Sequence, residues 1–368
     1  MSKISDLIES MCPNGVRFCK IGEVAEVGTG SSNGNESDDN GKFPFFVRSQ
    51  TIKRKNTYEY DEEAIIIPGE GGIGEIFHYI NGKYALHQRV YRIHFISNLI
   101  DSRFAYYYLS AYFKAFILRK AVSATVTSIR KPMIEQFPIP LPPLPVQQEI
   151  VRILDHFTEL TAELTAELTA RRKQYAYYRD ALLTFGGEVE YKSIMEIAPP
   201  RRGVRVVRNQ LEKTGKFPVF QNSIVPLGFY EKSNCGANKT FIITAGAAGE
   251  VGYSSTAFWA ADDCYYFDCT DKILDRFLYF VLTSKKTYLS GQIRKASIPR
   301  LGRNSIEKLV IGIPPLAKQR EIVSILDRFD AFCNDLTSGL PAEIKARKQQ
   351  YEYYRNKLLS FQEAKDDV

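Results

Sequence analysis

Two stretches of the chain carry apolar residues at helical spacing. Apolar residues recur every three or four positions from Ile150 to Leu182 and again from Ile322 to Leu358, and charged residues fill the other positions. A pair of prolines precedes each stretch, and Pro145 suits the first turn of a helix because its missing N–H needs no partner there. We predict two long helices, at about 145–185 and 316–361.

Breaks in the pattern set the limits of these helices. Gly186 and Gly187 follow the first stretch and are expected to end its helix. Gly339 and Pro341 interrupt the second stretch, and a proline inside a helix costs about 3 kcal/mol because it removes a hydrogen bond and clashes with the preceding turn. We therefore expect a kink or a restart near 338–341.

The first stretch contains a local repeat, which reads TEL, TAEL, TAEL and TA from Thr158 to Ala170. Its period places every leucine on one stripe, and we interpret it as a spacer whose length changes by whole units. Neither helix can bury a long apolar stripe alone, so we expect the two to pack antiparallel as a coiled coil with the globular domains at opposite ends. The alternative is that each helix lies on its own globular domain. The residues expected in the packing are Leu160, Leu164, Leu168, Tyr175, Tyr178, Leu336, Leu340, Ile344, Tyr351 and Tyr354.

The segments outside these helices, 1–140 and 187–312, mix strand-like runs with turn signals such as Asn81–Gly82. The runs with the composition of buried strands are AIIIP from Ala64, TFIIT from Thr240 and YYFDC from Tyr265. Each segment also has one short helical stretch, near 103–120 and 275–289. The predicted fold class is α+β, with two α+β domains that have irregular, mostly antiparallel sheets and are separated by the two long helices.

The sequence contains an internal repeat that spans most of the chain. LPPLPVQQEIVRILDHF from Leu141 returns as IPPLAKQREIVSILDRF from Ile313, and QYAYYRDALL from Gln174 returns as QYEYYRNKLL from Gln350. The preceding segments match more faintly, for example in GKFPFF and GKFPVF, so the plan is variable, shared, variable, shared. The predicted parts are a first domain at 1–141, a helical spacer at 142–186, a second domain at 187–313, a second helical region at 314–362 and a tail at 363–368.

The distribution of charge favours a polyanionic partner. The chain is basic, with a formal charge of +7, but many proteins without a nucleic-acid role are equally basic. Cations cluster at Lys53, Arg54 and Lys55 and between Arg201 and Arg208, and such clusters suit DNA because each neutralised phosphate releases counterions. A solvated surface face is the alternative interpretation.

Aligning the two copies suggests base-reading residues. The chain continues with Arg48, Ser49 and Gln50 after the first FPFF strand, and with Gln221, Asn222 and Ser223 after the second, FPVF. Arginine reads guanine and asparagine or glutamine reads adenine, so different residues on one scaffold would give two specificities; turn-forming polar residues are the alternative. The candidate DNA-binding residues are Arg48, Ser49, Gln50, Lys53, Arg54, Lys55, Arg130, Lys131, Arg201, Arg202, Arg205, Arg208, Gln221, Asn222, Ser223, Arg300 and Arg303.

Several kinds of chemistry lack their motifs in this sequence. Gly69, Gly71 and Gly74 match GxGxxG, but EIFHYINGKY after them suggests a hairpin rather than a helix, so we interpret the glycines as a tight turn. The sequence contains no [ND]-PP-[YF] tetrapeptide of an amino-methyltransferase, no P-loop and no HExxH. Six cysteines without CxxC spacing and four histidines give no metal-ligand pattern. No export signal or membrane span is present, so we expect a cytoplasmic protein with reduced thiols.

The whole arrangement resembles the specificity (S) subunits of Type I restriction–modification systems. The resemblance rests on the paired PPL…Q.EIV.ILD blocks, the QY.YYR..LL ends and the TAEL repeat. It implies that each variable segment is a target recognition domain that reads one half of a bipartite DNA site, and that the helices form an antiparallel coiled coil that sets the half-site spacing and docks two modification (M) subunits.

The resemblance also implies that the chemistry resides on other subunits. M subunits of this family bind S-adenosylmethionine and methylate adenine, and restriction (R) subunits join for ATP-driven translocation and cleavage. S-adenosylmethionine, ATP and Mg²⁺ are therefore expected on partner subunits, and this chain is expected to be non-catalytic. Three other interpretations remain: a self-sufficient modification enzyme, which the missing tetrapeptide argues against, a specificity-like protein of another defence or regulatory assembly, and a coiled-coil protein without a DNA role.

Overall fold

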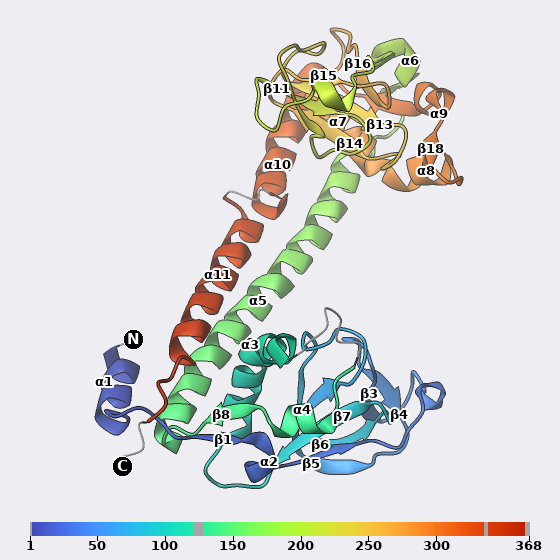
Figure 1. Cartoon of the computed structure of the whole chain (residues 1–368). Coiled ribbons are helices and arrows are strands. Elements are labelled where there is room, and N and C mark those ends of the chain that lie inside the picture. The colour runs from blue at the N-terminus through green and yellow to red at the C-terminus, as the bar shows by residue number, and fades with distance from the viewer. Residues whose placement is uncertain (1, 121–127, 335–337, 365–368) are drawn as a thin grey trace. The chain divides into compact units, whose positions relative to one another are not determined.

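The computed structural model describes residues 2–120, 128–334 and 338–364. The chain forms two compact units (Figure 1). Unit 1 comprises Met1–Glu163 and Lys345–Val368, and unit 2 comprises Leu164–Ile344. The long helix α5, Leu144–Leu182, therefore contributes its first part to unit 1 and its second part to unit 2.

Unit 1 is built on a six-stranded sheet in the order β2-β7-β5-β6-β3-β4. Neighbouring strands are antiparallel, except that β3 and β6 are parallel. β1 and β8 form a separate two-stranded sheet. The elements are α1 (Ser2–Met11), β1 (Phe18–Lys20), α2 (Ile21–Val24), β2 (Ala25–Thr29), η1 (Gly34–Glu36), β3 (Phe43–Phe46), β4 (Lys53–Lys55), β5 (Tyr60–Pro68), β6 (His78–Leu86), β7 (Val90–Phe95), α3 (Ser102–Lys120), α4 (Lys131–Glu135) and β8 (Pro138–Pro140).

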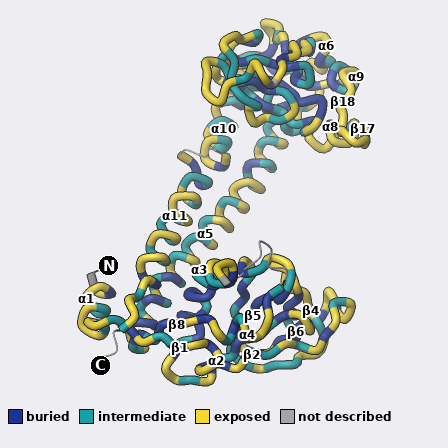
Figure 2. Tube along the Cα trace, viewed as in Figure 1, coloured by how far each residue is buried: buried dark blue, intermediate teal, exposed yellow. Residues whose placement is uncertain are grey.

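The core of unit 1 lies between this sheet and α3 (Figure 2). Ile65, Ile67 and Ile93 are fully buried on the sheet face that meets Phe104 and Phe113 of α3. Burying each such side chain contributes about 1.5–3 kcal/mol. The period of two along β5 turns the alternate positions to the opposite face of the sheet. The C-terminal segment closes the unit, because the Val16 N–H donates to the Gln362 carbonyl at 2.9 Å and the Ala364 N–H donates to that of Val16 at 2.9 Å.

Unit 2 repeats this topology in a more interrupted form. It has a four-stranded sheet in the order β10-β16-β13-β14 and a three-stranded sheet in the order β12-β11-β15. The elements are β9 (Glu190–Ser193), α6 (Ile194–Ile197), β10 (Pro200–Arg202), η2 (Arg208–Gln210), β11 (Phe217–Phe220), β12 (Gly228–Tyr230), β13 (Lys239–Ile243), β14 (Val251–Ser254), β15 (Trp259–Ala260), β16 (Cys264–Phe267), α7 (Asp275–Ser284), α8 (Lys286–Gly291), β17 (Ile293–Arg294), β18 (Arg300–Leu301), α9 (Arg303–Glu307), β19 (Val310–Ile313), α10 (Leu316–Asn334) and α11 (Leu340–Leu358).

The two units share the same strand order once one interruption is allowed for. β11 pairs antiparallel with β12 and parallel with β15, as β3 pairs antiparallel with β4 and parallel with β6. In unit 1 the strand β6 runs without a break from β5 to β3, whereas in unit 2 the corresponding strand is divided into β14 and β15. The prediction of two α+β domains with mostly antiparallel sheets is therefore confirmed.

One predicted turn is wrong. Asn81–Gly82 does not close a hairpin but lies inside β6, where Asn81 is opposite Glu63 and Gly82 is opposite Glu62. Pairing along nearly the whole of β5 outweighs the local turn preference, and Gly82 adopts a φ of +122° within the strand. The turn from β5 to β6 is instead the glycine-rich loop at 69–77, where the sequence predicted a tight glycine turn.

The helices differ from their predicted limits in two places. α5 ends at Leu182, before Gly186 and Gly187, and Leu182, Leu183 and Phe185 pack against the core of unit 2. The stretch predicted at 275–289 forms two helices, α7 and α8, divided at Lys285. The restart predicted in the second long helix is confirmed, since α10 ends at Asn334 and α11 begins at Leu340 with Pro341 in its first turn. Leu336 lies outside the described residues.

Aromatic residues join the long helices within each unit. In unit 2 the rings of Tyr175 and Tyr178 lie 6.3 Å and 5.7 Å from that of Phe329, and Arg172 donates to the Cys333 carbonyl at 3.4 Å. Residues further along α5 contact residues earlier in α10, so the two helices run antiparallel. In unit 1 Phe157 of α5 stacks on Tyr354 of α11 with 5.5 Å between ring centroids.

The three leucines of the repeat, Leu160, Leu164 and Leu168, are half-buried, as is Ile344; Leu340 is buried, and Tyr351 packs against the core of unit 1. No helix in the described ranges combines the length and the hydropathy needed to cross a membrane.

Candidate nucleic-acid interface

Three loops of unit 1 meet where β3, β5 and β6 end, and backbone hydrogen bonds hold them together. The His87 N–H donates to the Phe46 carbonyl at 3.0 Å, and the Gly69 N–H donates to the Arg89 carbonyl at 2.9 Å. The Ile129 N–H donates to the Gly69 carbonyl at 2.7 Å, which adds the segment that leads to α4. We call this arrangement the loop frame of unit 1.

The same frame occurs in unit 2. The Ala261 N–H donates to the Phe220 carbonyl at 2.9 Å, the Thr244 N–H to the Asp263 carbonyl at 2.8 Å, and the Leu301 N–H to the Thr244 carbonyl at 2.8 Å. These bonds match those of unit 1 position by position. In this alignment of the two frames, Arg48 is equivalent to Asn222, Glu70 to Ala245 and Arg89 to Asp263.

A glycine in each frame permits the close approach of the first and second loops. Gly71 and Gly246 have φ values of +75° and +82°. A Cβ atom on Gly71 would lie 3.2 Å from the Arg48 carbonyl oxygen, and one on Gly246 would lie 2.9 Å from that of Asn222. The left-handed backbone is one that glycine adopts without a steric penalty, so both frames depend on glycine at the same point.

In unit 1 the frame presents two arginines on one carboxylate. The Nη1 atoms of Arg48 and Arg89 each lie 3.0 Å from Oε2 of Glu70. Hydrogen bonds from Arg89 and Arg48 hold the pKa of Glu70 below its ordinary value. Beneath them the Arg89 backbone N–H donates to Nδ1 of His87 at 3.0 Å, and burial together with the two guanidinium groups lowers the pKa of His87. The cluster thus carries a net charge of about +1 near neutral pH.

In unit 2 the frame presents different chemistry. Asn222, Asp263 and Arg300 line a hollow of about 280 Å³, with Arg300 Nη1 3.8 Å from Asp263 Oδ1. Gln221 lies beside this hollow and donates to Asp262 Oδ1 at 3.4 Å. Arg202 Nε donates to the Asp262 backbone carbonyl at 3.0 Å. The structure therefore brings together Arg202, Gln221, Asn222 and Arg300, which the sequence singled out separately.

Comparison with known proteins identifies the family. The model of the Type I restriction modification DNA specificity domain matches residues 13–171 and 187–346. This chain belongs to that family. Its two matches correspond to the two copies found in the sequence, and each contains one loop frame. A type I restriction enzyme specificity subunit from Haemophilus influenzae is 30% identical over 351 residues, which cover 87% of this chain and 89% of that relative.

Other members support the assignment and the fold. The EcoR124I/EcoR124II specificity subunit of Escherichia coli is 33% identical over 256 residues, covering 62% of this chain and 63% of that protein. The crystal structure of the type I restriction–modification S subunit from M. genitalium matches with a TM-score of 0.68 at 17% identity and covers 94% of this chain and 96% of that chain. The chain is thus a type I specificity subunit for DNA recognition, with two α+β domains and long antiparallel helices.

The remaining candidate residues of this specificity subunit lie in several places. The basic run of β4 holds a neighbouring loop: Lys55 pairs with Glu36 at 2.6 Å, Arg54 Nε donates to the Gly41 carbonyl at 2.6 Å, and Lys53 Nζ lies 3.3 Å from Ser37 Oγ. Lys53 and Arg54 remain exposed at the edge of the sheet, whereas Lys55 is half-buried. Ser49 donates to the Thr51 carbonyl, Gln50 is exposed, and Ser223 accepts from the Val225 N–H.

Three of the other candidate cations have an intramolecular carboxylate partner. Arg201 lies 2.6 Å from Asp268, Lys131 lies 3.6 Å from Glu135, and Arg303 lies 2.6 Å from Glu307. Arg130 is exposed and occupies the position before α4, directly after the Ile129 that joins the frame of unit 1. Arg205 is also exposed. The side chain of Arg208 is outside the described part of the structure.

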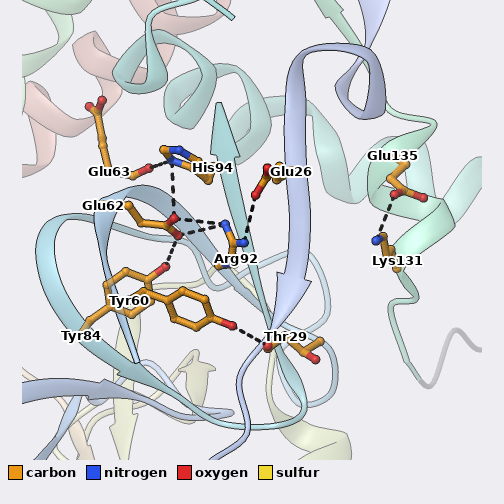
Figure 3. Close-up of polar contacts among 10 residues, drawn as sticks. All are labelled: Glu26, Thr29, Tyr60, Glu62, Glu63, Tyr84, Arg92, His94, Lys131 and Glu135. Carbon is orange, nitrogen blue, oxygen red and sulfur yellow. Dashed lines mark hydrogen bonds and ion pairs between the residues drawn. The ribbon is translucent and has the colours of Figure 1, made fainter. Parts of the chain in front are cut away.

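A polar network on the unit 1 sheet was not predicted from the sequence (Figure 3). Arg92 lies 3.0 Å from Glu62 and 3.2 Å from Glu26, and its guanidinium carbon is 4.7 Å from the centre of the Tyr60 ring. The Tyr84 hydroxyl donates to Glu62 at 2.8 Å. These residues lie on the sheet face opposite α3, so the network ties four strands together. The period-two alternation of charge along VYRIHF was the signal for it.

The start of each shared helix is anchored by the same two contacts. Gln147 and Gln319 are fully buried. The Gln147 amide donates to the Leu99 and Pro142 carbonyls and accepts from the Asp101 N–H, and Gln319 makes the equivalent bonds to Lys272, Pro314 and Leu274.

Arginine–aspartate pairs provide the second anchor. Arg103 of α3 lies 2.9 Å from Asp155 of α5, and Arg276 of α7 lies 2.7 Å from Asp327 of α10. Each guanidinium also lies over aromatic rings of its own unit, such as that of Tyr79 in unit 1 and that of Tyr253 in unit 2, at 4.7 Å and 4.6 Å from the ring centres. Each recognition domain is therefore fixed to its helix by a matching set of polar contacts.

Proposed function

We propose that this specificity subunit recognises a bipartite DNA target, with each unit reading one half-site. The observation that carries the proposal is the pair of matching loop frames. The backbone hydrogen bonds are the same in both frames, but the exposed side chains differ in charge and in hydrogen-bonding capacity. A shared scaffold with different side chains is what two readers of different sequences require, because base identity is read through donors and acceptors in the grooves.

The long helices are the proposed docking surface for two methyltransferase (M) subunits, with restriction (R) subunits joining the assembly. Exposed aromatic side chains on these helices support this assignment. In unit 2 Tyr177 of α5 is 70% exposed and Phe332 of α10 is 44% exposed, and in unit 1 Tyr353 of α11 is 62% exposed. Aromatic residues of this kind are enriched at the centres of protein interfaces.

The chain is proposed to act in the cytoplasm without a catalytic site of its own. S-adenosylmethionine, ATP and Mg²⁺ would bind the partner subunits, and the M subunits would transfer methyl groups to adenine. The relatives named above as specificity subunits support this division of labour. The sequence, in addition, has no amino-methyltransferase tetrapeptide and no P-loop.

The test is to co-express the chain with its cognate M subunits and to map methylated adenines across the genome. We expect one asymmetric motif made of two half-sites with a fixed gap, and no methylation when either subunit is omitted. Methylation of a contiguous motif, or methylation that does not require this chain, would contradict the proposal. The neighbouring genes decide whether another assembly uses the chain instead.

A further inference from the structure

The loop frame of unit 1 carries an arrangement whose chemistry can be matched to one base. We propose that Arg48 and Arg89, held together by Glu70, read a guanine in the half-site contacted by unit 1. This inference rests on the proposed function and assigns a role to Arg89 and Glu70, which neither the sequence motifs nor the comparisons single out.

The position of the cluster suits contact with a large partner. Arg48 and Arg89 lie on different loops, and their side chains are 48% and 57% exposed. The frame beneath them is fixed by hydrogen bonds from the His87, Gly69 and Ile129 backbones. Two flexible side chains are thus presented at one point by a rigid support, which lowers the entropy lost when they engage a ligand.

The negative charge of Glu70 favours a base over a phosphate as the ligand of the two arginines. Its carboxylate accepts from Nη1 of both arginines at 3.0 Å, and their hydrogen bonds lower its pKa, so it is ionised near neutral pH. A phosphate approaching these guanidinium groups would meet a second negative charge at close range. The O6 and N7 atoms of guanine are uncharged acceptors that an arginine contacts with two parallel bonds, so a guanine edge is favoured over the backbone.

Unit 2 provides an internal comparison. Its frame has Asn222, Ala245 and Asp263 where unit 1 has Arg48, Glu70 and Arg89. The paired arginines and their carboxylate are thus a property of one reader rather than of the scaffold. If these side chains read bases, changes in unit 1 will alter one half-site and leave the other intact.

The experiment uses the full chain in complex with its M subunits and maps methylation for Arg48→Ala and Arg89→Ala beside the parent. We expect the preference for guanine at one position of one half-site to fall by about 5- to 150-fold. The other half-site and the gap should remain unchanged. Lys83→Ala is the matched control, because Lys83 is a 45% exposed cation on β6 outside the frame. It should leave every base preference unchanged.

Glu70→Gln separates the two ligands further, since it retains both arginines but removes the negative charge. We expect tighter and more salt-sensitive binding to non-specific DNA together with a weaker preference for guanine. Uniform weakening of binding by Arg48→Ala and Arg89→Ala without any change in base preference would show that the pair holds phosphates and would overturn the inference. If the parent complex methylates no bipartite motif, the proposed function itself fails, which is a separate and recognisable result.

Discussion

Gln147 and Gln319 illustrate how single residues carry the repeated architecture. Each side chain is fully buried and satisfies two carbonyls and one N–H at the start of a long helix. A buried carbonyl or N–H left without a partner costs about 1–3 kcal/mol, so an amide that satisfies three of them is a strong local constraint. Both glutamines occupy the same place in the repeated PPL…Q.EIV block, so the sequence contained the signal.

Replacing Gln147 with leucine tests this constraint. The variant retains a similar volume but leaves the Leu99 and Pro142 carbonyls and the Asp101 N–H unpaired. We expect the free energy of unfolding to fall by about 2–4 kcal/mol. Gln148→Leu is the control, because Gln148 is exposed on the next position of the same helix and should cost less than about 0.5 kcal/mol. Urea denaturation followed by circular dichroism measures the free energy of unfolding of both variants. An equal fall in both would show that the buried hydrogen bonds of Gln147 have no role in stability.

The base-reading candidates show where single residues escape prediction. Arg48 and Asn222 could be paired from the sequence, because each follows a recognisable FPFF or FPVF strand at the same distance. Arg89 and Asp263 follow strands with little sequence likeness, and Glu70 lies in a glycine loop without a distinctive motif. Their association with Arg48 or Asn222 depends on three loops meeting in space, which local patterns do not encode.

Among the elements, β6 shows how pairing outweighs a local signal. Asn-Gly is a strong turn dipeptide, yet the strand passes through Asn81 and Gly82 because β5 offers it a continuous partner. The strands and helices with clear apolar periodicity were predicted well, because their apolar faces match the core that they meet. The helix break near Pro341 was also predictable, because proline acts on the backbone whatever its surroundings.

Gly82→Ala tests the backbone strain in β6. A Cβ atom on Gly82 would meet nothing within 4 Å, so any cost arises from the φ of +122° alone. A side chain in this region costs about 1–3 kcal/mol, and we expect the free energy of unfolding to fall by that amount. Gly186→Ala is the matched control, because its Cβ is equally unobstructed and its φ is not in the positive region. A calorimetric scan in which both variants unfold at the same temperature would refute the strain.

At the scale of the whole molecule, the repeated plan was the most predictable feature. Two variable segments on one scaffold and two shared helical blocks were evident from the sequence, and the family model matches the chain twice, once over each copy. The matching loop frames extend this plan to individual backbone hydrogen bonds. The exposed side chains of the two frames differ, so the shared scaffold was predictable from the sequence, whereas the chemistry that each frame presents was not.

The TAEL repeat in α5 lies where the chain passes from unit 1 to unit 2. Its threonines satisfy themselves within the helix, since the hydroxyls of Thr158, Thr161 and Thr169 donate to the carbonyls four residues earlier at 2.8–2.9 Å. One four-residue TAEL repeat can therefore be removed without leaving a buried polar group unpaired. α5 belongs to unit 1 up to Glu163 and to unit 2 from Leu164, so a deletion in this segment shortens the helix that connects the two units.

Deleting Thr165–Leu168 shortens α5 by about 6 Å at ~1.5 Å per residue and turns the following residues by only about 40° beyond a full turn. The leucine stripe nearly retains its face, so we expect a folded protein that keeps both half-sites. Because successive base pairs are ~3.4 Å apart, the preferred gap should shorten by about one to two base pairs. Deleting only two residues would rotate the rest of the helix by about 200° and place charge in the packed stripe, so that variant should lose stability. Methylation mapping of the parent and the four-residue deletion gives the answer, and an unchanged gap would mean that this segment does not set the spacing.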